Sequence, residues 1–237
     1  MTLSEDLKSM VNRVMQNQWD VRQANTVPDA SNLTLTGQVA KLDATVIYAD
    51  MRASSKLVDE LNQRVAGKVY QAFLFSLASI IKTNGGEITA YDGDRVMGIF
   101  IGDYKNTSAA KSALMINYAV IKILKPMLED HFNSLSKSGF KISHCVGIDT
   151  GSFLAVKAGL RSVNDIVWIG RPPNLAAKLS EIREEDYSEY ITNEVFQALD
   201  PSVKYGGKAN ELMWEQRSHS YLDENLTIYR SRYYWSF

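Results

Sequence analysis

The sequence predicts an α+β fold whose core runs strand, helix, strand, strand, helix, strand, the ferredoxin-like βαββαβ arrangement. Two long stretches carry apolar residues at helical spacing, and short apolar runs typical of strands lie before, between and after them. An Asp92-Gly93-Asp94 step joins two of these runs, and Asp-Gly is a strong hairpin signal. This topology places both long helices on one face of an antiparallel sheet.

The core begins with a nearly continuous apolar run at 44–49, which is typical of a central strand. The first helix follows, with a spacing of four between Leu57, Leu61, Val65, Val69, Phe73 and Leu77, and Gly85-Gly86 ends it. The remaining core elements are expected as strands at 87–91 and 95–101, a helix over 107–124 that Pro126 ends or kinks, and a strand at 141–149.

Two further segments flank this core. Residues 1–41 are expected to form an N-terminal helix, with apolar residues at helical spacing between 3 and 24, and a polar linker from 25. That helix either mediates dimerisation or packs back on the domain, which spans 42–237. The added C-terminal α+β lobe, 150–237, is expected to hold strands at 165–169, 212–214 and 227–235 and a helix over 174–182.

Composition excludes several classes of function. With 237 residues, 45% apolar content and a net charge of −1, the chain is typical of a globular protein without a basic field for nucleic acid or membrane. One cysteine and three histidines exclude an intrachain disulfide and argue against a zinc site. No signal peptide and no bilayer-length apolar run is present in the sequence, so we expect a cytoplasmic protein.

Two carboxylates are the strongest candidates for chemistry. Asp50 ends the first core strand and Asp94 lies in the hairpin, and the predicted topology brings both to one end of the sheet. Taken alone, Asp50 could cap the following helix and Asp94 could serve its turn. Taken together, they suit hard divalent cations such as Mg²⁺ or Mn²⁺, which prefer oxygen ligands.

The segment after Asp50 enters a helix, and a helix N-terminus offers free amides and a positive dipole end to phosphate oxygens. We therefore expect phosphate to bind at the residues that form this entry, which are Arg52, Ala53, Ser54 and Ser55. A helix cap formed by either serine uses the same geometry and is compatible with that role.

Four segments resemble, in order, the motifs of class III adenylate and guanylate cyclases. Residues 48–55 resemble the first metal motif, and Gly93-Asp94 resembles the second, 44 residues after Asp50. Residues 147–151 resemble the strand-turn motif that follows, and 170–179 resemble the helix that carries an Asn and a basic residue. The resemblance extends over about residues 42–200.

The resemblance implies a function and a set of roles. Asp50, Asp94 and the carbonyl of Met51 would hold two divalent cations. Asn174 would orient the ribose, and Lys178, where the family usually has arginine, would stabilise charge on the transferring phosphoryl group; a solvated helix residue is the alternative for Lys178. Because these two groups of residues meet across a dimer interface in the family, a homodimer would build two composite sites.

The base-reading positions depart from the purine-specific pattern. Where adenylate cyclases have a lysine and an aspartate, this chain has Ala90 and Val167, whose side chains form no hydrogen bonds. Tyr48, Tyr91 and Trp168 would narrow the pocket, although core packing is the commoner role of such residues.

These departures resemble the bacterial pyrimidine cyclases of the Pycsar antiphage systems. That resemblance implies conversion of UTP, or next CTP, to the cyclic monophosphate and pyrophosphate, with a separate effector protein responding to the product. A purine cyclase, or a degenerate module that only binds nucleotide, remains the alternative.

Overall fold

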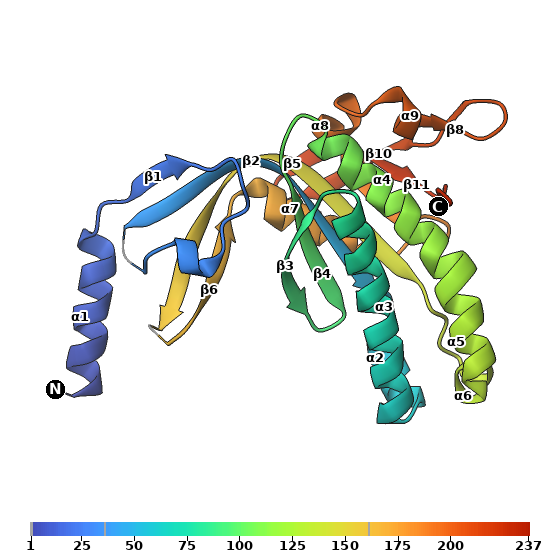
Figure 1. The fold of residues 1–237 in the computed structure, drawn as a ribbon, viewed down its shortest axis with the longest axis horizontal. Coiled ribbons are helices and arrows are strands. Elements are labelled where there is room, and N and C mark those ends of the chain that lie inside the picture. The colour runs from blue at the N-terminus through green and yellow to red at the C-terminus, as the bar shows by residue number, and fades with distance from the viewer. Residues whose placement is uncertain (1, 36, 161) are drawn as a thin grey trace.

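The computed structural model describes residues 2–35, 37–160 and 162–237. A nine-stranded sheet organises this part of the chain (Figure 1), and its main path runs β10-β11-β7-β5-β2-β4-β3. Two long strands form its centre, β2 (Gln38–Met51) and β5 (His144–Leu160). The others are β1 (Asp20–Gln23), which pairs with β2, β6 (Val163–Ile169), which pairs with β5, and β3 (Glu87–Asp92), β4 (Arg95–Phe100), β7 (Glu189–Thr192), β10 (Glu215–Tyr221) and β11 (Glu224–Ser231).

The predicted βαββαβ core is confirmed. It consists of β2, α3 (Gln63–Thr83), β3, β4, α4 (Lys105–Tyr118) and β5, and the strands pair antiparallel in the order β5-β2-β4-β3. Phe73 and Leu77 of α3 and Ile116 of α4 pack with Ile47 of β2 and Ile148 of β5 in one buried cluster. Both long helices therefore cover the same face of the sheet, as the topology requires.

The other face carries α7 (Arg171–Ser180). Ala176 of α7 packs with Val46 of β2 and Phe153 of β5 in a second buried cluster. Glycine at position 147 permits this packing, because a Cβ there would lie 2.1 Å from the carbonyl oxygen of Ala176 and 2.5 Å from the amide nitrogen of Ser180. The backbone of α7 thus rests directly on β5.

Pro126 does not end the second core helix. A π-helical segment, Ala119–Leu124, follows α4, and α5 (Lys125–His131) and α6 (Asn133–Lys137) continue the path. Pro126 lies in the first turn of α5, directly after the π-helical segment, whose last hydrogen bond runs from the Lys125 amide to the Val120 carbonyl. The switch from α-helical to π-helical hydrogen bonding before Pro126 keeps the chain helical through this position.

The flanking segments differ from the sequence predictions. The N-terminal helix, α1 (Leu3–Gln16), ends earlier than expected, and β1 replaces its predicted C-terminal part. Strand β2 begins at Gln38, before the expected domain boundary at 42, and linker residues Val27 and Leu33 pack on the sheet.

The C-terminal lobe also differs from the predictions, and the polar sequence of β10 lacks the alternation that marks a half-buried strand. β10 has only exposed and half-buried residues and was not expected, and neither was the short β7. The predicted strand at 212–214 is reduced to β9 (Glu211–Leu212), which pairs with β8 (Tyr205–Gly206), and that at 227–235 ends at Ser231 in β11. The short helices α8 (Asn193–Gln197) and α9 (Pro201–Lys204) complete the lobe.

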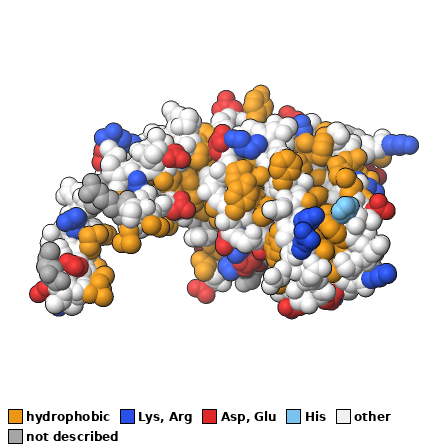
Figure 2. All heavy atoms as spheres, turned by 60° about the horizontal axis from the view of Figure 1, so that its bottom comes forward, with side chains coloured by type: hydrophobic (Ala, Val, Ile, Leu, Met, Phe, Trp, Pro, Cys, Tyr) orange, Lys and Arg blue, Asp and Glu red, His pale blue; other side chains and the backbone are white. Residues whose placement is uncertain are grey.

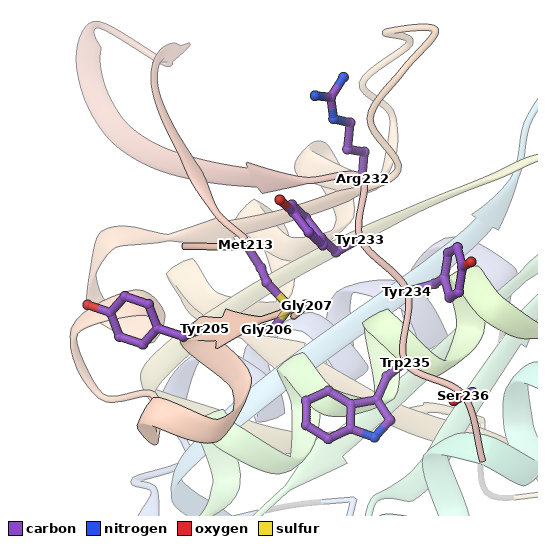
Figure 3. A pocket seen from close by; sticks show the side chains of 9 residues that line it. All are labelled: Tyr205, Gly206, Gly207, Met213, Arg232, Tyr233, Tyr234, Trp235 and Ser236. Carbon is purple, nitrogen blue, oxygen red and sulfur yellow. The ribbon is translucent and has the colours of Figure 1, made fainter. Parts of the chain in front are cut away.

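Helix α1 projects from the body at the N-terminal end of the chain (Figure 1), and none of its residues is buried. Its apolar side chains are exposed, including Leu7, Met10 and Val14, and Figure 2 shows hydrophobic side chains gathered on this arm. The expectation that it covers an edge of its own core is therefore wrong, whereas a role in dimerisation stays a prediction. No helix in the described ranges is long and apolar enough to span a bilayer.

The contact between Gly147 and α7 generates the first testable prediction. Gly147→Ala should lower the free energy of unfolding by about 2 kcal/mol, because the added Cβ must push α7 off the sheet. Gly67→Ala is the matched control, since an added Cβ at Gly67 of α3 meets nothing within 4 Å and alanine favours the helix by about 0.5–1 kcal/mol. Denaturant unfolding measures both changes, and equal stability of the two variants would contradict the assigned contact.

Candidate functional site

Asp50 and Asp94 lie in one pocket at an end of the sheet, as the topology predicted. Asp50 is the penultimate residue of β2 and pairs with Arg95, the first residue of β4, so that Asp94 in the preceding turn lies next to it. The pocket has a volume of about 390 Å³, and its lining is formed by Asp50, Met51, Ala53, Ser54, Ser55, Asp94, Arg95, Glu181 and Arg183.

The Asp50 carboxylate is buried and electrostatically strained. Its relative exposure is 6%, and burial raises its pKa to about 6. The charge of Asp94 acts in the same direction, whereas a hydrogen bond from Arg183, with Nη2 2.7 Å from Oδ2, favours the ionised form. A buried carboxylate beside a second one is stable in its charged form only when a cation offsets the two charges.

The first turn of α2 (Ser54–Glu60) borders the carboxylates. Its N-cap residue, Ala53, has a left-handed backbone conformation with φ of 54°, and no side chain caps the helix. Backbone amides of a first turn have no acceptor within their own helix. The structure therefore brings Ala53, Ser54 and Ser55 to the pocket that holds Asp50 and Asp94.

Arg52 is arranged differently from its neighbours. Its guanidinium donates to the backbone carbonyls of Glu184 and Tyr187, in the loop that follows α7. The side chain does not line the carboxylate pocket. Arg52 therefore ties the loop after α7 to the end of β2, and a phosphate contact from this residue stays a prediction.

Asn174 and Lys178 lie one turn apart on the exposed side of α7, and neither lines the pocket of Asp50 and Asp94. Lys178 forms an ion pair with Glu181, at 2.9 Å, and Glu181 is also 3.3 Å from Arg95. Within one chain, Asn174 and Lys178 therefore lie outside the pocket of the predicted metal ligands, although Lys178 contacts Glu181, which lines it.

Three of the five predicted base-pocket residues come together. Tyr48, Ala90 and Trp168 are half-buried against the same apolar cluster, and the Trp168 ring meets the Phe153 ring edge-on at a centroid distance of 6.0 Å. Burial raises the pKa of Tyr48, so that its hydroxyl stays protonated and able to donate a hydrogen bond. The other two side chains are largely exposed, with relative exposures of 57% for Tyr91 and 46% for Val167.

Sequence reasoning did not identify the three charged residues that complete the pocket, Arg95, Glu181 and Arg183. Arg183 is 133 positions from Asp50, and its loop has no motif. The position of Arg95 directly after Asp94 was an available signal, since strand pairing sets it opposite Asp50. Glu181 and Arg183 reach the pocket because the loop after α7 leads the chain back to the end of β2, and this tertiary contact has no signal in the sequence.

The neighbours His144 and Cys145 do not form a nucleophile and base pair. His144 Nε2 is 3.1 Å from Glu189 Oε1, whereas the Cys145 thiol contacts the carbonyl oxygen of Leu179 in α7 at 3.4 Å. Burial raises the pKa of Cys145 to about 12 and lowers that of His144 to about 3. Both groups are therefore neutral near pH 7, and an acyl-transfer mechanism through them is not supported.

Comparison with known proteins finds similar chains of nearly equal length. The uridylate cyclase of Rhodovulum sp. (strain MB263) is 40% identical over 234 residues, which cover 99% of this chain and 98% of that protein. Uridylate cyclases from Xanthomonas perforans and Burkholderia cepacia are 39% and 37% identical and also match over at least 99% of both chains. No protein-family profile matches the sequence.

Solved structures of similar shape come from cyclases of other specificities. The adenylyl cyclase CyaB from P. aeruginosa has a TM-score of 0.68 at 19% identity, over 81% of this chain and 95% of that one. The guanylyl cyclase Cya2 also has a TM-score of 0.68, at 15% identity, over 82% and 93%. At such identities the likeness concerns the fold alone.

Proposed function

The chain belongs to the uridylate cyclase family, and on that premise we propose that it closes UTP into 3′,5′-cyclic UMP with release of pyrophosphate. The predicted cyclase fold is confirmed by its structural likeness to adenylyl and guanylyl cyclases. The observation that carries the proposal is the pocket that holds Asp50 and Asp94 beside the first turn of α2, because it combines cation ligands with amides that can bind phosphate.

The pocket suits two divalent cations, Mg²⁺ or Mn²⁺. Among the described residues no group of three or more His, Cys, Asp and Glu is placed to hold a metal ion, so the carboxylates supply only part of a coordination shell. Such a shell is typical of Mg²⁺, which is held by one or two carboxylates and by substrate phosphates. Asp50, Asp94 and the Met51 carbonyl would hold the ions, and bound ions would supply Lewis-acid stabilisation of the attacking and leaving oxygens.

The remaining residues would bind and orient the substrate. The amides of the Ser54 and Ser55 turn would bind phosphate oxygens, and Asn174 would orient the ribose so that its 3′-oxygen faces the α-phosphorus. Lys178, as a compact charge, would stabilise the negative charge that develops on the transferring group once it leaves Glu181.

The position of Asn174 and Lys178 outside the carboxylate pocket supports a homodimeric enzyme. Both side chains are exposed on α7, so in a dimer they would be open to the carboxylates of a second chain. A two-fold dimer would then build two identical composite sites.

The base is proposed to be read without a charged side chain. The hydroxyl of the half-buried Tyr48 would offer one donor, and Trp168, which packs against the same apolar cluster as Ala90, would limit the space for a base. Such a site leaves its polar groups unpaired with the wrong base, which gives strong discrimination. CTP is the second candidate substrate; a purine cyclase would need polar groups where Ala90 and Val167 stand.

We also propose a biological context, supported by the resemblance to Pycsar cyclases. The cyclic nucleotide would act as a second messenger in bacterial antiphage defence, in the cytoplasm, on a separate effector that the enzyme does not contact directly. No constitutive nucleic acid ligand is proposed.

The substrate is tested by incubating the purified protein with each of the four ribonucleoside triphosphates and Mn²⁺. We expect cyclic UMP as the main product, identified by mass spectrometry, and we expect Tyr48→Ala to admit some purine because it removes bulk from the pocket. Tyr91→Ala is the control, since this exposed side chain contributes little to the pocket wall. Faster formation of cyclic AMP or cyclic GMP by the wild-type protein would refute the substrate assignment.

The metal ligands are tested with Asp50→Asn and Asp94→Asn. Each should lower kcat by at least about 100-fold, because removing a ligand removes stabilisation of the reacting oxygens. Asp92→Asn is the matched control: it lies in the same hairpin, its carboxylate is 3.6 Å from Arg95, and it does not line the pocket. Activity of either ligand variant at the control's level would exclude the two-metal arrangement.

The composite site is tested by mixing two inactive variants. Asp50→Asn and Asn174→Ala proteins should together regain activity, because a heterodimer contains one doubly altered site and one intact site. Activity is compared with that of each variant alone after subunit exchange has been verified by native mass spectrometry. If exchanged heterodimers stay inactive, each chain holds its own complete site.

A further inference from the structure

Arg183 is the cation that contacts the buried carboxylate in this structure. Its Nη2 lies 2.7 Å from Asp50 Oδ2, and its Nη1 donates to the carbonyls of Ser180, at 2.8 Å, and Ile182, at 3.2 Å. Its side chain is 46% exposed, whereas that of Asp50 is 8% exposed. The guanidinium thus bonds to the last residue of α7 and to the loop after it, and it lines the pocket beside Asp50.

A divalent cation and Arg183 would compete for the same carboxylate. An ion at Asp50 would carry twice the charge of a guanidinium and would bind a carboxylate oxygen directly, so it would displace the hydrogen bond from Arg183. Its anchors at Ser180 and Ile182 belong to its own chain segment, and they keep the displaced guanidinium at the pocket. The displaced guanidinium would then be available to another anion, and guanidinium groups form their strongest hydrogen bonds with carboxylates and phosphates.

The triphosphate of the substrate is such a partner. A nucleoside triphosphate carries about four negative charges near neutral pH, and Asp50 and Asp94 add to them. Two divalent ions offset only part of this total, so the bound state favours a further cation beside the phosphates.

Of the nearby basic side chains, Arg183 is best placed for this exchange. Arg52 is held by two backbone carbonyls, and Arg95 is within ion-pair distance of Glu181 and Asp92, which are not predicted metal ligands. Lys178 does not line the pocket. Among the described residues that line it, Arg183 is the one whose carboxylate partner the metal would take.

We propose that Arg183 is a phosphate-binding residue of the cyclase. It pairs with Asp50 in the free enzyme and moves to the triphosphate of the substrate when the metal binds to Asp50. This inference rests on the proposed function for its substrate. The exchange keeps the buried Asp50 carboxylate paired at every stage, first with the guanidinium and then with the metal. It also couples the two binding steps, so that the bound metal raises the affinity for nucleotide and the bound nucleotide raises the affinity for metal.

The test uses the full-length protein, Mn²⁺ and inorganic pyrophosphate, and does not require turnover. In Arg183→Gln, Mn²⁺ alone should bind about tenfold more tightly, because its competitor at Asp50 is gone, whereas pyrophosphate binding to the Mn²⁺-loaded protein should weaken about tenfold. Arg183→Lys should retain part of the pyrophosphate affinity. Isothermal titration calorimetry measures each affinity, and thermal unfolding confirms that the variants are folded.

Arg171→Gln is the matched control. Arg171 begins α7 and pairs with Glu194 and Asp149, outside the carboxylate pocket, so both affinities should stay at their wild-type values. Unchanged or weaker Mn²⁺ binding by Arg183→Gln would overturn the exchange, and unchanged pyrophosphate binding would overturn the phosphate contact. A wild-type protein that cyclises none of the four nucleotides would refute the proposed function, while the Mn²⁺ and pyrophosphate titrations would still decide the role of Arg183.

Discussion

The antiparallel pairing of β2 with β5 is the constraint on which the site depends. Pairing extends from Val39 to Met51 of β2, so the register of the whole ladder determines where Asp50 lies. A slip of one residue would move every β2 side chain to the opposite face and exchange Asp50 for Ala49, which packs under α3 and α4. The register therefore specifies the position of the carboxylate: it places Ile47, Ala49 and Met51 under the helices and Asp50 on the opposite face.

That register creates an electrostatic difficulty, which the loop after α7 resolves. A buried carboxylate next to Asp94 is unfavourable without a cation, and the loop supplies one through Arg183. The same loop is held by Arg52, whose guanidinium binds the carbonyls of Glu184 and Tyr187. Two arginines thus connect β2 with this loop. Arg52 extends from the end of β2 to the loop, and Arg183 extends from the loop to Asp50 of β2. The carboxylate, its neighbouring turn and the loop form one connected unit.

Sequence patterns revealed the parts of this fold that depend on local periodicity. The apolar run of β2, the spacing of four in α3 and the Asp-Gly hairpin together predicted the core and the meeting of Asp50 with Asp94. They did not reveal β10, whose residues are mostly polar because it lies at an edge of the sheet, or the π-helical segment that carries the chain past Pro126. Arg183 was also missed, because no local pattern reports a contact across 133 positions.

The position of α7 links the packing of the fold to its chemistry. Because the Gly147 backbone admits α7 against β5, Asn174 and Lys178 are held on a rigid element, outside the pocket of their own chain's Asp50 and Asp94. Precise placement of such groups contributes much of the rate of an intramolecular attack. The close packing of α7 on the sheet supplies that precision within one chain. In the proposed dimer, the association of two chains would set the distance from Asn174 and Lys178 to the carboxylates across the interface.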